Sequence, residues 1–174
     1  MVNEFEIRGD VTVIFLSGRN GESLEALIDT DDLSKVQEFP YKWFARWCPH
    51  TKSYYVAGNT KRQNGKASTL IFHRYIMTPG KGVMIDHINH NELDNRKSNL
   101  RMVTNAENQQ NRKGPRTGNI SGYRGVSWNK KKEKWVAYYR LNGKLTYLGE
   151  FLDRHEAGRI AAKARLEVMP YAVS

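Results

Sequence analysis

The chain has 174 residues, of which 39% are hydrophobic and 26% charged, a composition typical of one globular domain or two small ones. Its formal net charge of +10 predicts a polyanionic partner, and neither a membrane nor a small-molecule substrate is expected. A single cysteine, Cys48, excludes an internal disulfide and a multi-cysteine zinc site, and the N-terminus shows no signal peptide, so we expect an intracellular protein.

The first part of the chain predicts a β-rich region. Apolar and β-branched runs predict strands at residues 11–16, 26–28, 43–47 and 53–57. Asn20 and Gly21 are a hairpin signal between the first two strands, and a helix cap at Asp29 precedes a short helix. Lys61, Arg62 and Lys66 lie in a loop that suits phosphate contact, although an exposed charged turn explains them equally well.

Residues 69–77 begin as a strand and turn into a helix that carries His73 and Arg74. The next apolar run, residues 83–85, ends in Asp86 and His87, and a loop rich in Asn and Asp follows. A second short strand then leads into a helix, which Thr104 and Glu107 cap as a capping box. The region from Val83 to Asn111 therefore predicts a strand, a tied-down loop, a strand and a helix.

The polar residues of this region suit metal-dependent hydrolysis. Adjacent residues of a strand point to opposite faces, so Asp86 and His87 can serve different roles around one centre. A carboxylate from Asp86 and an amide oxygen from Asn108 would suit one hard divalent cation, Mg²⁺ or Mn²⁺. The imidazole of His87 is suited to act as the general base that activates water. His90 and Asp94 fit turn residues better than ligands.

At these residues the sequence resembles the HNH nuclease motif, in the HNN variant found among phage homing endonucleases. The resemblance implies that Asp86 binds the metal, that His87 is the general base and that Asn99 ties the loop together. It implies Asn108 as the second ligand, while Asn105 and Asn111 remain alternatives because both could share its helix face. It also implies that His73 and Arg74 lie beside the metal and contact the scissile strand or a phosphate, with a helix-face His and a surface Arg as the alternative.

A basic linker and a basic C-terminal module are predicted after this motif. Residues 112–122 contain three Gly and one Pro, and Arg112, Lys113 and Arg116 could follow a DNA backbone or simply be solvated. Residues 112–174 hold 14 Lys and Arg against 5 Asp and Glu, while residues 1–111 hold 14 against 13. The positive charge therefore belongs to the last third of the chain.

Residues 123–174 predict three strands and a helix. β-prone runs lie at residues 126–128, 135–141 and 146–148, with Asn142 and Gly143 as a hairpin turn, and a helix is predicted over residues 154–168. The segment is similar to the APETALA-type (AP2/ERF, ethylene-response-factor) DNA-binding domain at residues 123–126, 135–137, 147–149, Phe151 and 156–157. The resemblance implies a three-stranded antiparallel sheet, packed on one helix, that enters the DNA major groove.

Carried over by position, the resemblance implies a set of DNA-facing residues, while Trp135 is assigned to the core. These residues are Arg124, Ser127, Asn129, Lys134, Tyr138, Arg140 and Tyr147, with Trp128 near them. The run Lys130, Lys131 and Lys132 is predicted to contact phosphate, with solvation alone as the alternative.

Together these features predict an α+β protein that is a site-specific, homing-type DNA endonuclease. The expected organisation is an HNH domain over residues 1–111 (β-rich 1–72, ββα motif 73–111), a linker over 112–122 and an AP2/ERF-like domain over 123–174. We expect one divalent ion per site and nicking of double-stranded DNA by a monomer, with a dimer as the alternative. The rival hypotheses are a non-catalytic DNA-binding regulator with a decayed nuclease module and, with less support, an RNA-binding or RNA-cleaving protein.

Overall fold

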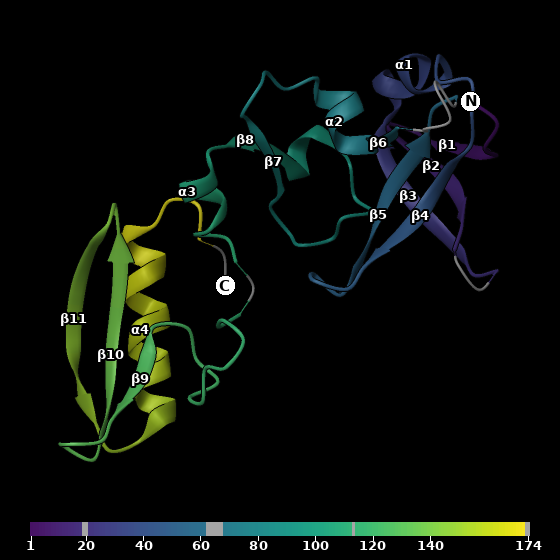
Figure 1. Ribbon diagram of the computed structural model, residues 1–174. Helices are drawn as coiled ribbons and strands as arrows, with labels where there is room; N and C mark the ends of the chain where they lie inside the picture. Colours follow the sequence, from purple (N-terminus) through teal and green to yellow (C-terminus); the bar gives the residue numbers. More distant parts are fainter. Residues whose placement is uncertain (19–20, 62–67, 113, 173–174) are drawn as a thin grey trace. The chain divides into compact units, whose positions relative to one another are not determined.

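A computed structural model describes residues 1–18, 21–61, 68–112 and 114–172. The chain forms two compact units, Met1–Val103 and Thr104–Ser174 (Figure 1). Strands predominate and the helices are few, so the predicted mixed α+β class is confirmed. Of the predicted turn and loop residues, Asn20, Arg62 and Lys66 lie outside the described ranges.

The first unit begins with two three-stranded antiparallel sheets. Their strand orders are β1-β2-β3 and β4-β5-β6. The strands are β1 (Phe5–Arg8), β2 (Val11–Ser17), β3 (Ser23–Asp29), β4 (Trp43–Cys48), β5 (Ser53–Asn59) and β6 (Thr69–Ile71). Between the sheets in sequence lie η1 (Thr30–Asp32) and α1 (Leu33–Gln37), and α2 (Phe72–Met77) follows β6 directly. All four strands predicted in this region are present.

One apolar core joins the strands β2, β3, β4 and β5 with the helices α1 and α2. Strand alternation in β2 and β3 directs Ile14 and Ile28 into this core, where neither side chain is exposed to solvent. Trp43 of β4 packs edge-on against Phe72 of α2, with ring centroids 4.7 Å apart. Burying such side chains contributes roughly 1.5–3 kcal/mol each, which fixes α2 against the sheets.

The predicted catalytic strands form a two-stranded hairpin of β7 (Met84–His87) and β8 (Leu100–Val103), with η2 (Lys97–Asn99) before the second strand. The loop between them is attached to β3 by backbone hydrogen bonds. Leu27 N donates to Leu93 O at 2.9 Å, and Asn95 N donates to Leu27 O at 2.8 Å. The large core of the first unit thereby holds the loop in position.

The second unit contains α3 (Asn105–Asn108), β9 (Val126–Asn129), β10 (Lys134–Leu141), β11 (Lys144–Phe151) and α4 (Arg154–Val168). The three strands form an antiparallel sheet in the order β11-β10-β9, and α4 packs along one face of it (Figure 1). Val126 and Ala137 of the sheet meet Ala157 and Ala161 of α4, and these small side chains allow close approach. Strands and helix lie at the predicted positions, and the strands extend slightly further.

The segment predicted as a linker is ordered by side-chain hydrogen bonds within the second unit. Ser121 is almost fully buried, and its Oγ donates to Val126 O at 3.0 Å. Asn119 Nδ2 donates to the same carbonyl at 3.2 Å. The Gly and Pro content of this segment predicted a linker, and polar side chains attach its C-terminal half to β9. The predicted domain bounds remain a prediction.

Candidate active site

Asp86 and His87 are neighbours on β7, and both side chains are largely buried, with 9% and 5% of their surface exposed. Asp86 lies directly opposite Arg101 in the β7–β8 register. Both Nε and Nη2 of Arg101 donate to Asp86 Oδ2, at 2.9 and 2.7 Å. This pair holds the carboxylate in position and balances its charge at the end of the strand.

His87 is oriented by Asn95, whose side chain has no exposed surface. The Nε2 atom of His87 lies 3.3 Å from Asn95 Oδ1. The Asn95 amide is itself fixed, because its Nδ2 donates to the carbonyls of Leu93 at 3.1 Å and Glu92 at 3.4 Å. Since Oδ1 can only accept, His87 Nε2 carries the proton and donates, which leaves the lone pair of the neutral ring on Nδ1.

Two further rings pack against His87. His73 of α2 is buried, and its ring meets His87 edge-on with centroids 5.0 Å apart. Tyr55 of β5 lies beside both imidazoles, at 6.1 and 6.2 Å. The cluster brings together β5, α2 and β7, which are distant in sequence. His73 is one of the two residues that the sequence predicted to lie beside the site.

Burial controls the protonation of this cluster. It lowers the pKa of His73 to about 3, with smaller contributions from the neighbouring His87 and Arg74. Burial also lowers the pKa of His87, although the Asn95 hydrogen bond and nearby carboxylates oppose the shift. Burial, with the Glu92 carboxylate nearby, raises the pKa of Tyr55 to about 12. Both imidazoles are therefore neutral at pH 7, as a proton acceptor must be.

Arg74 has a different environment from His73. Its Nη1 donates to Val83 O at 3.0 Å, and the side chain is exposed. The contact links α2 to the residue that precedes β7. A role of Arg74 in contacting the scissile strand remains a prediction.

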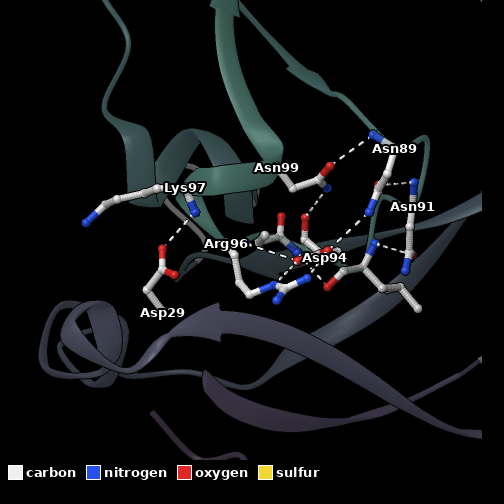
Figure 2. A network of polar contacts seen from close by, with 9 residues as sticks. Asp29, Asn89, Asn91, Asp94, Arg96, Lys97 and Asn99 are labelled. Atoms are coloured by element: carbon white, nitrogen blue, oxygen red, sulfur yellow. Dashed lines mark hydrogen bonds and ion pairs between the residues drawn. The ribbon is translucent and has the colours of Figure 1, made fainter. Parts of the chain in front are cut away.

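Asn99 ties the loop between β7 and β8 together. Its Oδ1 accepts from Asn89 N at 2.9 Å, and its Nδ2 donates to Asp94 O at 2.8 Å (Figure 2). Asp94 accepts from Arg96 Nε at 2.8 Å and Nη2 at 2.7 Å, and from Asn89 Nδ2 at 3.1 Å. Asp94 is thus a buried loop anchor, in agreement with its assignment as a turn residue.

A second set of contacts anchors the loop to the preceding elements. Lys97 N donates to Asp29 Oδ2 at 2.7 Å, as Figure 2 shows. Lys97 Nζ forms an ion pair with Asp32 Oδ1 at 2.6 Å. Together with the backbone hydrogen bonds to β3, these contacts attach the loop between β7 and β8 to the preceding elements.

The predicted second metal ligand, Asn108, belongs to the second unit, where it is the last residue of α3. The predicted capping box is present: Thr104 accepts from Glu107 N, and Glu107 accepts from Thr104 N at 2.7 Å. The helix has only four residues, so Asn111 lies beyond it, and the argument that Asn111 shares a helix face with Asn108 fails. The choice of Asn108 remains a prediction.

The carboxylate of Asp86 could serve as a protein ligand for one hard divalent cation in an open site. No group of three or more His, Cys, Asp or Glu side chains able to hold a metal is found within the described ranges. Mg²⁺ does not require such a group, since it commonly takes one or two protein oxygens and completes its shell with water and substrate phosphate. Asp86 supplies a buried carboxylate of this kind. Among the residues that the structure describes, no side chains are placed to form a closed zinc-type site.

In the second unit, strand register places six of the predicted DNA-facing residues on one face of the sheet, opposite α4. Trp135 packs against the α4-side core, and side chains alternate along each strand. Residues paired across strands share a face, which links Ser127 to Val136 and Tyr138 to Tyr147. The six residues are Ser127, Asn129, Lys134, Tyr138, Arg140 and Tyr147, and we name this surface the outer face.

Other predicted contacts are placed differently. Trp128 lies opposite Trp135, with ring centroids 4.9 Å apart, so it belongs to the α4 side and not to the outer face. Lys132 forms an ion pair with Glu150 at 2.7 Å, so the charge of Lys132 is balanced within the second unit. Lys130 and Lys131 are exposed in the turn after β9. Lys113 lies outside the described ranges.

Arg124 has a structural role that the sequence did not reveal. Its Nη1 donates to the carbonyls of Gln110 and Arg112, and its Nη2 donates to Gln109 O, at distances of 2.6–2.9 Å. The guanidinium thereby joins the chain after α3 to the sheet. These bonds engage the group that the resemblance assigned to DNA, so we leave Arg124 out of the outer face.

Sequence reasoning missed two residues of the candidate active site, Asn95 and Arg101. Arg101 could have been found, because pairing the two predicted strands places it opposite Asp86. Asn95 gave no separate signal, since it is one of several Asn residues in the loop and only the folded loop brings it to His87. Among the described residues, no helix has the length and apolar composition to span a membrane.

Comparison with known proteins gives a family match over this site. Residues 77–110 match the family described as HNH endonuclease. The chain is 32% identical over 140 residues to an uncharacterized HNH endonuclease of Acanthamoeba polyphaga mimivirus, covering 77% of this chain and 66% of the relative. It is 42% identical over 64 residues to protein 3.8 of Escherichia phage T7, covering 37% and 52%. The chain thus spans between half and two thirds of these relatives, and no solved structure matches it.

Proposed function

Given that the chain contains an HNH endonuclease domain, matched over residues 77–110, we propose that it is a homing-type DNA endonuclease that hydrolyses a phosphodiester with the help of one divalent ion. The orientation of His87 by Asn95 carries the proposal, because it gives a buried neutral imidazole whose lone pair is on Nδ1. A general base requires this state at neutral pH. The HNH relative from a mimivirus supports the same activity.

In this mechanism His87 accepts a proton from the water that attacks the phosphorus atom. Asp86 would hold the ion within the first unit, and Arg101 holds the Asp86 carboxylate in place. Bound Mg²⁺ or Mn²⁺ would stabilise the negative charge that develops on the phosphate. The second ligand is proposed to be Asn108, on the sequence motif alone.

The proposed roles of His73 and Arg74 differ from each other. His73 packs against His87 and excludes water from one side of the base, so it acts by positioning. Arg74 is exposed, and its planar donor group suits a phosphate of the scissile strand.

The C-terminal unit is proposed to recognise the target, in the manner of an AP2/ERF-like domain. Its outer face combines cations, amides and aromatic side chains without apolar packing against α4, and Tyr147 is 56% exposed. Each good base contact contributes about 1–3 kcal/mol of discrimination, which a small hydrolytic site does not provide. The residues proposed for base or phosphate contact are Ser127, Asn129, Lys134, Tyr138, Arg140, Tyr147, Lys130 and Lys131.

A plasmid assay tests the proposal. The pure protein is incubated with supercoiled plasmid and Mg²⁺ or Mn²⁺, beside His87→Ala and the control His50→Ala, whose side chain is exposed in the turn after β4. We expect metal-dependent open circles from the wild type and the control, and none from His87→Ala despite retained DNA binding. One site per monomer predicts nicking, whereas immediate linear product would indicate a dimer. Cleavage by His87→Ala at the wild-type rate would refute the assignment. Duplex binding without any cleavage would favour the regulator hypothesis.

A further inference from the structure

The second unit contains a pocket of about 730 Å³ beside the half of β10 that does not pair with β9. Strand β9 pairs with β10 only as far as Ala137, after which Gly125 O accepts one more hydrogen bond, from Tyr138 N at 2.8 Å. The pocket opens where this pairing stops. Five of its lining residues are arginines: Arg112, Arg116, Arg124, Arg140 and Arg165.

No carboxylate of the described residues forms an ion pair with these five cations. The described residues that line the pocket include no Asp or Glu. Burial lowers the pKa of Arg124 to about 10, with further contributions from the positive charges of Arg165 and Arg112. Like charges gathered without a counter-charge repel one another, and a bound anion would relieve this repulsion.

Several of the arginines are fixed by the backbone, so the pocket is built before a ligand arrives. Arg124 donates to three carbonyls, and Arg165 Nη1 donates to Arg124 O. Arg140 Nη1 donates to Gly143 O at 2.8 Å. Arg116 is exposed at the rim, where its guanidinium can reach a ligand. Neutral carbonyls hold these groups without cancelling their charge.

We propose that this pocket binds a phosphate group of the DNA backbone, an inference that rests on the proposed function of the chain. Guanidinium groups match the oxygen geometry of phosphate, and arginine is the preferred residue for such recognition. Tyr138 and Arg140 line the pocket and also belong to the outer face. A DNA strand lying on the outer face therefore reaches the pocket at the edge of β10, which favours backbone phosphate over a free anion.

The test measures how binding of a short duplex, without a selected target sequence, depends on salt. The background is His87→Ala, which prevents cleavage from interfering. The pocket variant is Arg112→Gln with Arg116→Gln, and the control is Arg154→Gln with Arg159→Gln. The control arginines are exposed on α4, away from the outer face, and the change in net charge is the same.

Each phosphate contact contributes about 0.9 to the slope of log Kd against log salt concentration. We expect a slope shallower by about 1–2 in the pocket variant and nearly unchanged in the control. The single variant Arg116→Gln changes only an exposed side chain, so it should not disturb the fold. It should lower the slope by about 1. Equal slopes for pocket and control variants would overturn the inference.

A second arm uses inorganic phosphate and a deoxynucleoside monophosphate in titration calorimetry. Saturable binding of either ligand, lost in the pocket variant while the duplex slope stays unchanged, would overturn the assignment to DNA and identify a free-anion site. The plasmid assay is independent of both arms. If the wild type nicks DNA but the pocket and control variants have equal salt slopes, only this inference is contradicted. If the wild type never nicks DNA but the two variants have unequal slopes, only the proposed catalysis is contradicted.

Discussion

The Nε2 atom of His87, at the end of β7, lies 3.3 Å from the Oδ1 atom of Asn95 in the loop that follows, and both residues are buried. Asn95 N is bonded to Leu27 O of β3, so the orienting amide is carried by a segment that the sheet holds rigid. The hydrogen bond selects the tautomer of His87 with the proton on Nε2. In the proposed mechanism, Nδ1 is then the ring nitrogen that would accept the proton from water.

We predict that Asn95→Ala lowers the single-turnover nicking rate roughly ten- to a hundredfold, as is typical for residues that orient a catalytic ligand. Duplex affinity should stay unchanged, because Asn95 is buried and cannot contact DNA. The matched control is Asn91→Ala, an exposed residue of the same loop. A pH profile of the rate separates orientation from stability: loss of the hydrogen bond, which raises the pKa of His87, should move the acidic limb to lower pH. An unshifted profile with a wild-type rate would contradict this role.

The buried His73 predicts a loss of stability in acid. The unfolded chain protonates this imidazole below pH 6.5, whereas the folded state resists protonation until about pH 3. Between these values the unfolded state binds more protons, so stability falls as the pH falls. The expected loss is about 2 kcal/mol between pH 7 and pH 5.

The measurement is urea unfolding of the wild type and His73→Gln at pH 5, 6 and 7. The variant removes the titrating ring, so its unfolding free energy should depend less steeply on pH. His50→Gln is the control, since its side chain is exposed. Parallel pH dependences for the wild type and His73→Gln would show that this imidazole does not supply the effect.

The sequence predicted the elements better than the contacts between them. Local signals such as the Asn142 and Gly143 turn and the capping box at Thr104 depend on neighbouring residues, and both are present with the expected geometry. The role of Asn99 followed from the family motif, and the structure contains the expected backbone hydrogen bonds. Contacts between residues distant in sequence were harder to predict. The assignment of Arg124 to DNA, from its position in a motif, stays a prediction, and its hydrogen bonds to carbonyls that precede the sheet were not foreseen.

We predict that Asp94→Ala destabilises the first unit by about 2–3 kcal/mol, because it removes the buried, charged acceptor of the hydrogen bonds from Arg96 and Asn89. Asp94 is 2% exposed and accepts from Arg96 and Asn89. The control Asp31→Ala removes an exposed carboxylate and should change stability by less than about 0.5 kcal/mol. Chemical denaturation measures both. Equal effects would mean that the loop does not depend on this carboxylate.

Gly125 tests how closely the chain before β9 packs against β10 in the second unit. Its φ is +81°, and a Cβ atom added there would lie 2.2 Å from Tyr138 O, which is much too close for any side chain. Gly118 has a nearly identical φ of +84°, but an added Cβ meets nothing within 4 Å. Gly118→Ala therefore carries only the conformational cost of about 1–2 kcal/mol, whereas Gly125→Ala must also separate Gly125 from β10.

We accordingly expect Gly125→Ala to lower the unfolding free energy of the second unit by at least about 3 kcal/mol, and more than Gly118→Ala. The lost contact is the hydrogen bond from Tyr138 N to Gly125 O, which continues the β9–β10 pairing at the edge of the arginine-lined pocket. Loss of this hydrogen bond should also weaken duplex binding. The rings around His87 in the first unit should stay packed. Denaturation followed by tryptophan fluorescence, with duplex binding measured in parallel, checks both expectations. Equal destabilisation by the two substitutions would show that the backbone conformation at Gly125, and not its close approach to β10, is what requires glycine.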